Sequence, residues 1–203
     1  MLFRSVADAF EIFIGPSLKG SQGQFFTPRN VVQMVVDIVD PGPQHRILDP
    51  ACGSGGFLVE ALRHVWKKVD EEGREYDWPQ HEVEAEKSKV ATKNFFGIDK
   101  DNFLAKVAKA YMAILGDGRG GVYCENTLER PVNWSKETNI EIQKGKFDII
   151  LTNPPFGKKL AIDSDDILKQ YDLGHAWKKE AAAQFARGDV LDKQTPQILF
   201  IER

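Results

Sequence analysis

Apolar residues follow two alternating spacings along the chain, and this alternation predicts its helices and strands. Positions 2–14 carry apolar residues at helical spacing and predict an amphipathic helix. A second apolar helix is expected over 28–39, with Thr27 as its N-cap and Pro28 at its first position. The proline-glycine-proline run at 41–43 would end it.

The next part of the chain alternates strand-like and helix-like patterns. Short apolar runs typical of buried parallel strands occupy 46–48, 94–98, 121–123 and 147–151. Helical spacing occupies 57–69 and 102–115. The alternation predicts an α/β fold, a doubly wound Rossmann-like sheet with helices on both faces. Such sheets have five or more strands, so we expect further strands beyond residue 203.

Other segments have weaker signals. The polar stretch at 71–93 is longer than a typical connection and predicts an insertion with its own helical turn. From Gly157 onward the pattern is polar and helical in places, with little strand signal, and 196–203 reads as the start of an apolar helix. We therefore divide the chain into a helical N-terminal segment, 1–43, and a C-terminally incomplete catalytic domain, 44–203.

Composition is that of a soluble globular protein, with 42% hydrophobic and 28% charged residues. No apolar run suits a signal peptide or membrane span, so we expect a cytoplasmic protein. The cysteines, Cys52 and Cys124, have no neighbours at metal-ligand spacing, which predicts small, reduced core residues and no metal site. The formal net charge of -3 argues against a chain that holds DNA unaided.

A glycine-rich turn at 49–57 follows the first expected strand and opens a helix. Glycines let backbone approach a ligand, although a plain tight turn is the alternative. Asp49, at the carboxyl end of that strand, suits a ligand with positive charge. Asp99 ends the second strand, where ribose hydroxyls are held in nucleoside-binding sheets; its alternative role is a helix N-cap.

The sharpest signal is Asn153-Pro154-Pro155-Phe156, directly after the apolar run at 147–151. The prolines fix the backbone, while the Asn153 amide oxygen and the Pro154 carbonyl can accept both hydrogens of a planar amino group. Phe156 offers a flat face on which a base can stack. The alternative is a proline turn that leaves a strand.

These motifs resemble those of amino-methyltransferases of DNA, most closely the modification (M) subunit of type I restriction-modification systems. Residues 23–29 (GQFFTPR) match that family's upstream cofactor motif, 49–57 its main cofactor loop and 153–156 its catalytic loop, in the expected order. Three motifs in register are much more specific than one. The resemblance covers about residues 20–156.

The resemblance implies transfer of a methyl group from S-adenosylmethionine to the N6 amino group of a flipped-out adenine in DNA. It implies that the catalytic residues are Asn153, Pro154, Pro155 and Phe156. The cofactor residues it implies are Gln24, Phe25, Phe26, Thr27, Pro28, Asp49, Ala51, Gly53, Ser54, Gly55, Gly56, Phe57, Asp99, Lys100, Asn126 and Leu128. The implied partners are DNA, a specificity (S) subunit and a second M subunit, with a restriction (R) subunit as an optional further partner.

Two other functions stay open at this stage. One is methylation of another planar nitrogen, in protein glutamine or RNA guanine, although such enzymes resemble the loop form with a final tyrosine and lack the 23–29 motif. The other is a truncated subunit that binds cofactor or a partner without turnover. The four histidines have no partners at catalytic spacing and are expected to be surface or structural residues.

Overall fold

The computed structural model describes residues 27–117, 121–181 and 184–203. The helix expected over 2–14 and the expected cofactor residues Gln24, Phe25 and Phe26 lie outside these ranges.

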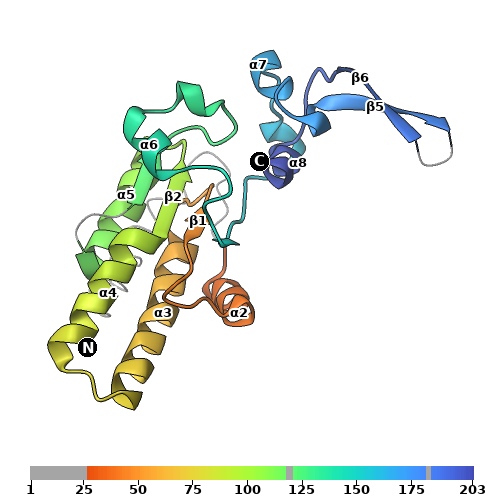
Figure 1. Ribbon diagram of the computed structural model, residues 1–203. Helices are drawn as coiled ribbons and strands as arrows, with labels where there is room; N and C mark the ends of the chain where they lie inside the picture. Colours follow the sequence, from red (N-terminus) through yellow and green to blue (C-terminus); the bar gives the residue numbers. More distant parts are fainter. Residues whose placement is uncertain (1–26, 118–120, 182–183) are drawn as a thin grey trace.

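The central element is a parallel sheet of four strands in the order β3-β2-β1-β4 (Figure 1). The strands are β1 (Ile47–Asp49), β2 (Phe95–Asp99), β3 (Gly121–Cys124) and β4 (Ile149–Ile150). They match the four apolar runs within two residues at each end, because strands buried on both faces are apolar throughout. The predicted parallel α/β sheet is confirmed.

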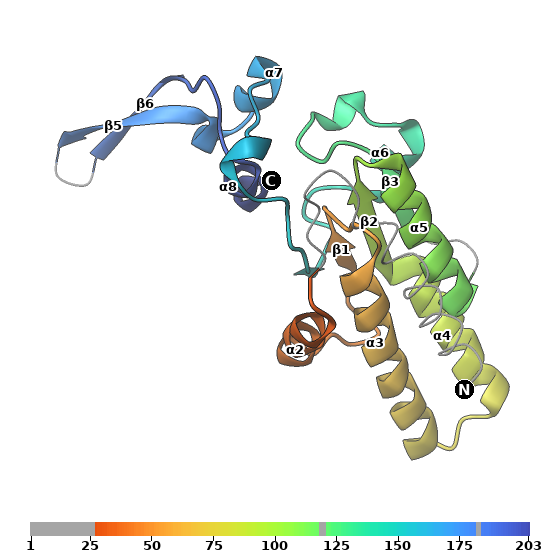
Figure 2. The same ribbon diagram turned by 180° about the vertical axis from the view of Figure 1, so that it is seen from behind.

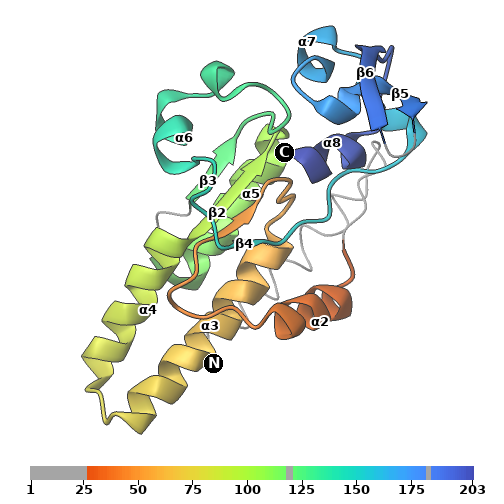
Figure 3. The same cartoon turned by 45° about the vertical axis from the view of Figure 1, so that its right-hand side comes forward.

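Alternate strand residues face two different cores. Ile47 and Phe95 pack with the long helices that cover one face of the sheet. These helices are α2 (Arg29–Val39), α3 (Gly56–Glu75), α4 (Gln80–Asn94) and α5 (Asn102–Met112). The π-helix η1 (Ala113–Asp117) continues α5. Leu48 and Phe96 pack on the other face with Trp134 and Ile142. Those two residues flank α6 (Lys136–Glu141), which follows the short 3-10 turn η2 (Pro131–Asn133). Figure 3 shows the long helices and α6 on opposite sides of the sheet.

Two predicted local features are wrong. α2 begins at Arg29 with Pro28 at the N-cap, and the Thr27 side chain does not cap it. The polar stretch at 71–93 forms more than a helical turn: α3 extends to Glu75, and α4 then runs for 15 residues. α4 buries only Val83, Val90 and Ala91, so its apolar pattern is too sparse to be recognised as a long helix.

The chain after the catalytic loop forms a separate small unit that lies apart from the sheet in Figures 1 and 2. Its elements are η3 (Lys158–Leu160), α7 (Asp165–Leu168), η4 (Asp172–Gly174), β5 (His175–Ala181), β6 (Gln184–Val190) and α8 (Pro196–Glu202). The expected apolar helix at 196–203 is confirmed as α8. The expectation of little strand structure here is wrong, because β5 and β6 pair as an antiparallel hairpin.

The cysteines differ in environment. Cys52 is a free, buried core residue, as expected, whereas Cys124 is exposed at the end of β3, so its predicted core position is wrong. Among the residues described, no group of histidine, cysteine, aspartate and glutamate side chains could hold a metal ion. In the same part of the chain, no helix has the length and apolar character needed to cross a bilayer.

Candidate cofactor and catalytic site

The order of the strands places the candidate residues at one edge of the sheet. β2 and β3 follow β1 on one side of it, and the chain then crosses to the other side of β1 to form β4. The order of the strands therefore reverses between β1 and β4. In open parallel sheets, ligands bind beyond the carboxyl ends of the strands at such a reversal. Asp49 ends β1, Asp99 ends β2 and Asn153 follows β4, so all three lie at this edge.

The glycine-rich turn after β1 has the backbone that its glycines permit. Gly53 and Gly55 have φ of 53° and 89°, a conformation that other residues rarely adopt. The Cys52 N–H donates to the Ile98 carbonyl at 2.9 Å, which ties the turn to β2. A Cβ on Gly55 would lie 3.2 Å from the Ala108 Cβ, whereas one on Gly53 or Gly56 would meet nothing within 4 Å. Gly55 therefore serves packing, and open space lies over Gly53 and Gly56.

Asp49 is a buried acid, with 1% of its surface exposed. The pKa of its carboxyl is raised to about 7, mainly because the group is buried; the nearby Asp99 charge contributes to the rise, and the Thr152 hydroxyl and the Ala51 N–H oppose it. The Ala51 N–H donates to Oδ1 at 3.1 Å. The buried Thr152 hydroxyl has no close hydrogen-bond partner among the described residues, so its effect on this pKa is weak. The carboxyl lacks a cationic partner in the described structure.

Asp99 holds the neighbouring loops together. Its Oδ2 accepts a hydrogen bond from the Gly53 N–H at 2.8 Å, and its Oδ1 accepts one from the Asp101 N–H at 2.8 Å. Burial is the main cause that raises the pKa of this carboxyl. The alternative role of Asp99 as a helix cap is wrong, because Asp101 caps α5 by accepting from the Phe103 and Leu104 N–H groups.

These features fit S-adenosylmethionine, which carries an ammonium, a sulfonium and two ribose hydroxyls. The buried Asp49 and the half-buried Asp99 stand at adjacent strand ends, and a ligand cation would offset the cost of their charge there. Each carboxylate oxygen has two lone pairs, so both oxygens of Asp99 can still accept from hydroxyl groups. The open space over Gly53 and Gly56 leaves room for the ligand.

The catalytic loop is held beside the start of α2. The Leu151 N–H donates to the Leu48 carbonyl at 3.1 Å and so extends the pairing of β4 with β1. Beyond it, the Asn153 Nδ2 donates to the Thr27 Oγ1 at 2.9 Å. This contact joins the end of the 23–29 motif to the catalytic loop and leaves the Asn153 amide oxygen for another donor. The Phe156 ring is 51% exposed.

Other expected cofactor residues lie in different surroundings. Phe57 lies in the first turn of α3 and is buried in the core, and Lys100 is exposed. The Asn126 Oδ1 accepts from the Leu128 N–H at 3.2 Å, and the Leu128 side chain packs with the C-terminal unit. Contact of these side chains with a cofactor stays a prediction.

Two threonines also lie near the site. Thr127, which the family resemblance places with Asn126 and Leu128 beside the cofactor's adenine, is buried, and its hydroxyl donates to the Pro50 carbonyl in the glycine-rich turn at 2.5 Å. Thr152, which was not expected from the sequence, lies beside Asp49. An isolated threonine carries no sequence signal of its own, so only the fold brings Thr152 to the site.

The histidines have structural contacts. His64 lies 2.8 Å from the Asp40 carboxylate and so joins α3 to the end of α2. His45 accepts from the Gly42 N–H at 2.9 Å, and the His175 Nδ1 lies 2.8 Å from the Tyr171 carbonyl. These positions lie away from the strand ends that carry Asp49 and Asn153.

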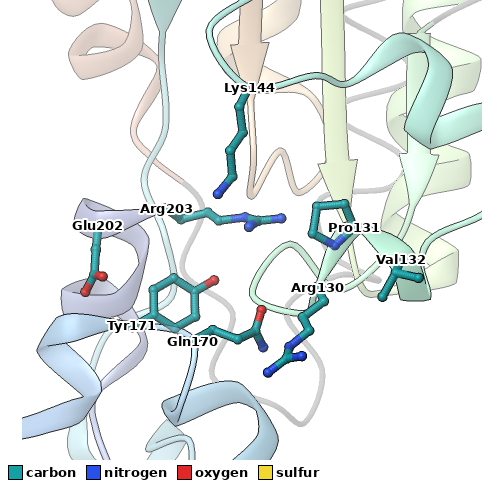
Figure 4. Close-up of a pocket in the computed structure, with 8 residues that line it drawn as sticks. All are labelled: Arg130, Pro131, Val132, Lys144, Gln170, Tyr171, Glu202 and Arg203. Carbon is teal, nitrogen blue, oxygen red and sulfur yellow. The ribbon is translucent and has the colours of Figure 1, made fainter.

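A hollow of about 360 Å³ lies between the segment after β3 and the C-terminal unit (Figure 4). Its lining comprises Arg130, Pro131, Val132, Lys144, Gln170, Tyr171, Glu202 and Arg203. The Arg203 guanidinium stacks 5.0 Å from the Trp134 ring centre and donates to the Glu129 carbonyl at 3.2 Å. None of the site residues expected from the sequence lines this hollow, so it is distinct from the candidate site.

A pair of glycine substitutions separates packing from ligand space. A Cβ on Gly97 would lie 2.8 Å from the Leu58 Cδ1 and 3.1 Å from the Cys52 Sγ. We expect Gly97→Ala to destabilise the chain by about 1–3 kcal/mol through overpacking. Gly56→Ala meets no protein atom within 4 Å, so we expect little change in stability but weaker S-adenosylmethionine binding.

Chemical denaturation and calorimetric titration of both variants check this prediction. Unchanged cofactor affinity in Gly56→Ala would show that the space over the turn does not hold the ligand.

The comparisons with known proteins agree with this geometry. The type I restriction enzyme EcoEI methylase subunit of Escherichia coli is 29% identical over 75% of this chain and 26% of its own length. The EcoKI methylase subunit of Escherichia coli K12 is 30% identical, over 68% of this chain and 24% of its own length. This chain therefore spans about a quarter of these relatives.

Solved structures agree as well. A modification subunit of a putative type I restriction enzyme from Vibrio vulnificus YJ016 has a TM-score of 0.58 and 29% identity, covering 84% of this chain and 32% of its own. A chain from a type I restriction-modification system, solved in a study of complex assembly and conformational transition, has a TM-score of 0.58 and 28% identity, covering 83% of this chain and 30% of its own. The model of the N-6 DNA Methylase family matches residues 4–194, and this chain therefore belongs to that family.

Proposed function

We propose that this chain is the catalytic part of a type I modification subunit and transfers a methyl group from S-adenosylmethionine to the N6 amino group of adenine in DNA. The observation that carries the proposal is the position of Asn153. It lies at the strand end next to Asp49. Its amide nitrogen donates to the Thr27 hydroxyl, so its amide oxygen can accept a hydrogen bond from the amino group of the base that is methylated.

The chain's own residues would hold the two reactants. Asp49 would accept from the ammonium of the bound cofactor, and Asp99 from its ribose hydroxyls. When bound, S-adenosylmethionine supplies an electrophilic methyl group. The Asn153 amide oxygen and the Pro154 carbonyl would accept both hydrogens of the adenine amino group, which makes its nitrogen lone pair available, while Phe156 stacks on the base.

Because this amino group is inaccessible inside a duplex, the base must be flipped out. The net charge of -3 indicates that other subunits supply most of the grip on DNA. We therefore propose that a specificity subunit and a second modification subunit assemble with this chain, and that a restriction subunit can join them.

The direct test is methyl transfer by the assembly with its specificity subunit. Purified assembly, duplex DNA and methyl-labelled S-adenosylmethionine are incubated, and the DNA is digested to nucleosides. We expect the label in N6-methyladenine. Label in cytosine, protein or RNA instead would contradict the proposed acceptor.

The contact between Thr27 and Asn153 yields a separate prediction. Thr27→Val keeps the shape but removes the oxygen that accepts from the Asn153 amide, so the amide loses its fixed orientation. We expect kcat to fall about tenfold, because one hydrogen bond to a neutral group contributes about 1 kcal/mol. Thr27→Ser keeps the oxygen and should retain most of the rate.

Steady-state kinetics with separate kcat and cofactor KM check it. A large rise in cofactor KM with unchanged kcat would mean that Thr27 acts on the cofactor and not on Asn153.

A further inference from the structure

The β5–β6 hairpin stands out from the rest of the molecule in both Figure 1 and Figure 2. Its two strands form a sheet of their own, paired only with each other. An isolated two-stranded hairpin is marginally stable in water unless other elements support it. Its shape therefore calls for a role other than building the core.

The strand register sorts its side chains onto two unlike faces. Trp177 pairs with Arg187, and Lys179 pairs with Phe185. Directly opposed residues of an antiparallel pair share a face, as do residues two apart on one strand. One face therefore carries two aromatic and two cationic side chains. We call this set, Trp177, Lys179, Phe185 and Arg187, the aromatic-basic face.

The opposite face is different in character. Lys178 pairs there with Ala186, so a cation stands opposite a methyl group. A Cβ on Gly188 would lie 3.1 Å from the Ala176 carbonyl oxygen, so this side is closely packed and carries small residues near the base of the hairpin. The two large aromatic side chains, Trp177 and Phe185, thus lie on the aromatic-basic face.

The aromatic-basic face is exposed but held at its base. Trp177 is 44% exposed and Phe185 60% exposed. The Trp177 Nε1 donates to the Asp172 carbonyl at 2.9 Å, and the Arg187 Nη1 lies 3.1 Å from the Asp172 carboxylate. Lys179, farther along the strand, makes no ion pair within the described part of the chain. Asp172 of η4 thereby holds Trp177 and Arg187 in place, and both rings are still open to a partner.

The chemistry of this face fits nucleic acid. Aromatic rings interleaved with cations combine base stacking with contacts to phosphate. The described residues of the hairpin carry three cationic side chains and two acidic ones, in a chain whose formal net charge is -3. The hairpin therefore carries a small local excess of positive charge, to which Lys179 contributes without an ion pair in the described part of the chain.

The placement of the C-terminal unit agrees with this reading. Leu128, which follows β3, packs with Leu168, Tyr171 and Leu199, and the Tyr171 hydroxyl donates to the Leu128 carbonyl at 2.9 Å. These contacts fix the unit at the carboxyl end of the sheet, where Asn153 also lies. The hairpin is thus held on the same end of the molecule as the proposed acceptor site.

We propose that the aromatic-basic face binds the DNA that flanks the methylated base, with Lys179 and Arg187 on phosphates and the rings of Trp177 and Phe185 on bases exposed beside the flipped nucleotide. This proposal rests on the proposed function, and it adds a second contact with the same substrate. It also explains why the rings of Trp177 and Phe185 are exposed to water.

Two charge reversals on one strand test the proposal. Lys179→Glu changes the aromatic-basic face, and Lys178→Glu makes the same change on the opposite face. DNA affinity of the assembly with its specificity subunit is measured by fluorescence anisotropy across a range of salt concentrations. We expect Lys179→Glu to weaken binding about tenfold and to reduce the salt slope by about one, while Lys178→Glu changes it less than about threefold.

A second readout tests the rings. DNA should quench part of the assembly's tryptophan fluorescence, and Trp177→Phe should remove that part, because a stacked base quenches an indole. Equal effects of the two charge reversals, or no effect of either, would overturn the proposal. So would a Lys179→Glu chain that no longer joins the specificity subunit, since that result assigns the face to a protein contact.

Cofactor binding separates this proposal from the proposed function. If the wild-type assembly binds neither S-adenosylmethionine nor DNA, both are wrong. If it binds and methylates DNA while the Lys179→Glu chain behaves as wild type, only the role of the hairpin is wrong.

Discussion

Replacement of Asn153 by alanine should remove nearly all methyl transfer and leave cofactor affinity within about twofold. The side chain is exposed beyond β4 and bonds only to Thr27 among the described residues, so its loss should not disturb the fold. Its amide oxygen is the proposed acceptor from the adenine amino group. Loss of a contact that forms at the reacting atom lowers the rate by about 10²–10⁴-fold.

Single-turnover transfer at saturating cofactor and DNA measures this effect, and calorimetric titration gives the cofactor affinity of the same variant. Phe156→Ala serves as a companion, because it removes the stacking face and leaves both acceptors. We expect it to weaken binding of DNA that contains the target adenine more than it lowers the rate. Equal losses of rate and cofactor affinity in Asn153→Ala would contradict the assigned role.

Replacement of Asp49 by asparagine should have opposite effects on cofactor binding and on stability. The variant loses the charge that would meet the cofactor's ammonium, and we expect affinity at pH 8 to fall about 100-fold, since hydrogen bonds to charged groups contribute about 1.5–3 kcal/mol. The free chain should become more stable at the same pH, because asparagine places no charge in this buried position.

The pH dependence follows from the direction of the shift. Burial raises the pKa of Asp49 from 3.8 in the unfolded chain to about 7 in the folded one. The folded chain therefore binds the extra proton between these values, and its stability declines as pH rises through this window. At pH 8 the ionised carboxylate destabilises the free chain, and we expect Asp49→Asn to raise its free energy of unfolding by about 1–3 kcal/mol.

Below pH 3.8 the wild-type carboxyl is protonated in both the folded and the unfolded chain, so wild type and Asp49→Asn should unfold at similar denaturant concentrations there. Cofactor affinity of the wild type should rise with pH up to about 7 and then level off. Above this pH the Asp49 carboxyl is already ionised in the free chain, so cofactor binding no longer has to remove its proton. The affinity of Asp49→Asn should lack this rise. Equal pH profiles for the two chains would show that Asp49 does not bind the cation.

The sequence was sufficient to predict the sheet because its central strands, β1 and β2, are buried on both faces. Ile47, Phe95 and Val122 belong to one core, and Leu48 and Ile98 to the other, so the strands read as unbroken apolar runs. The glycine-rich turn and the Asn153 loop were recognisable because their residue types have few other uses directly after a strand.

The β5–β6 hairpin could not be predicted on the same basis. Its strands expose charged and aromatic residues on the aromatic-basic face and small residues or lysine on the other, so neither a continuous apolar run nor a simple alternation marks them. Only the register of the folded hairpin shows that Trp177 and Phe185 share a face with two cations.

Contacts between residues that are distant in the sequence could not be predicted either. Thr27 looked like a helix cap, because threonine commonly fills that position; in the structure its hydroxyl accepts from Asn153 instead. Similarly, a helix N-cap was the alternative role expected for Asp99. In the structure Asp101 caps α5, and Asp99 accepts from the Gly53 N–H instead.

The most direct test of the proposed cofactor site is calorimetric titration of S-adenosylmethionine into this chain at pH 8, with Asp49→Ala as the matched control. We expect the wild type to bind the cofactor at a single site and the control to lose this binding. Binding of equal strength in both chains, or no binding to the wild type, would contradict a cofactor site at the carboxyl ends of β1 and β2.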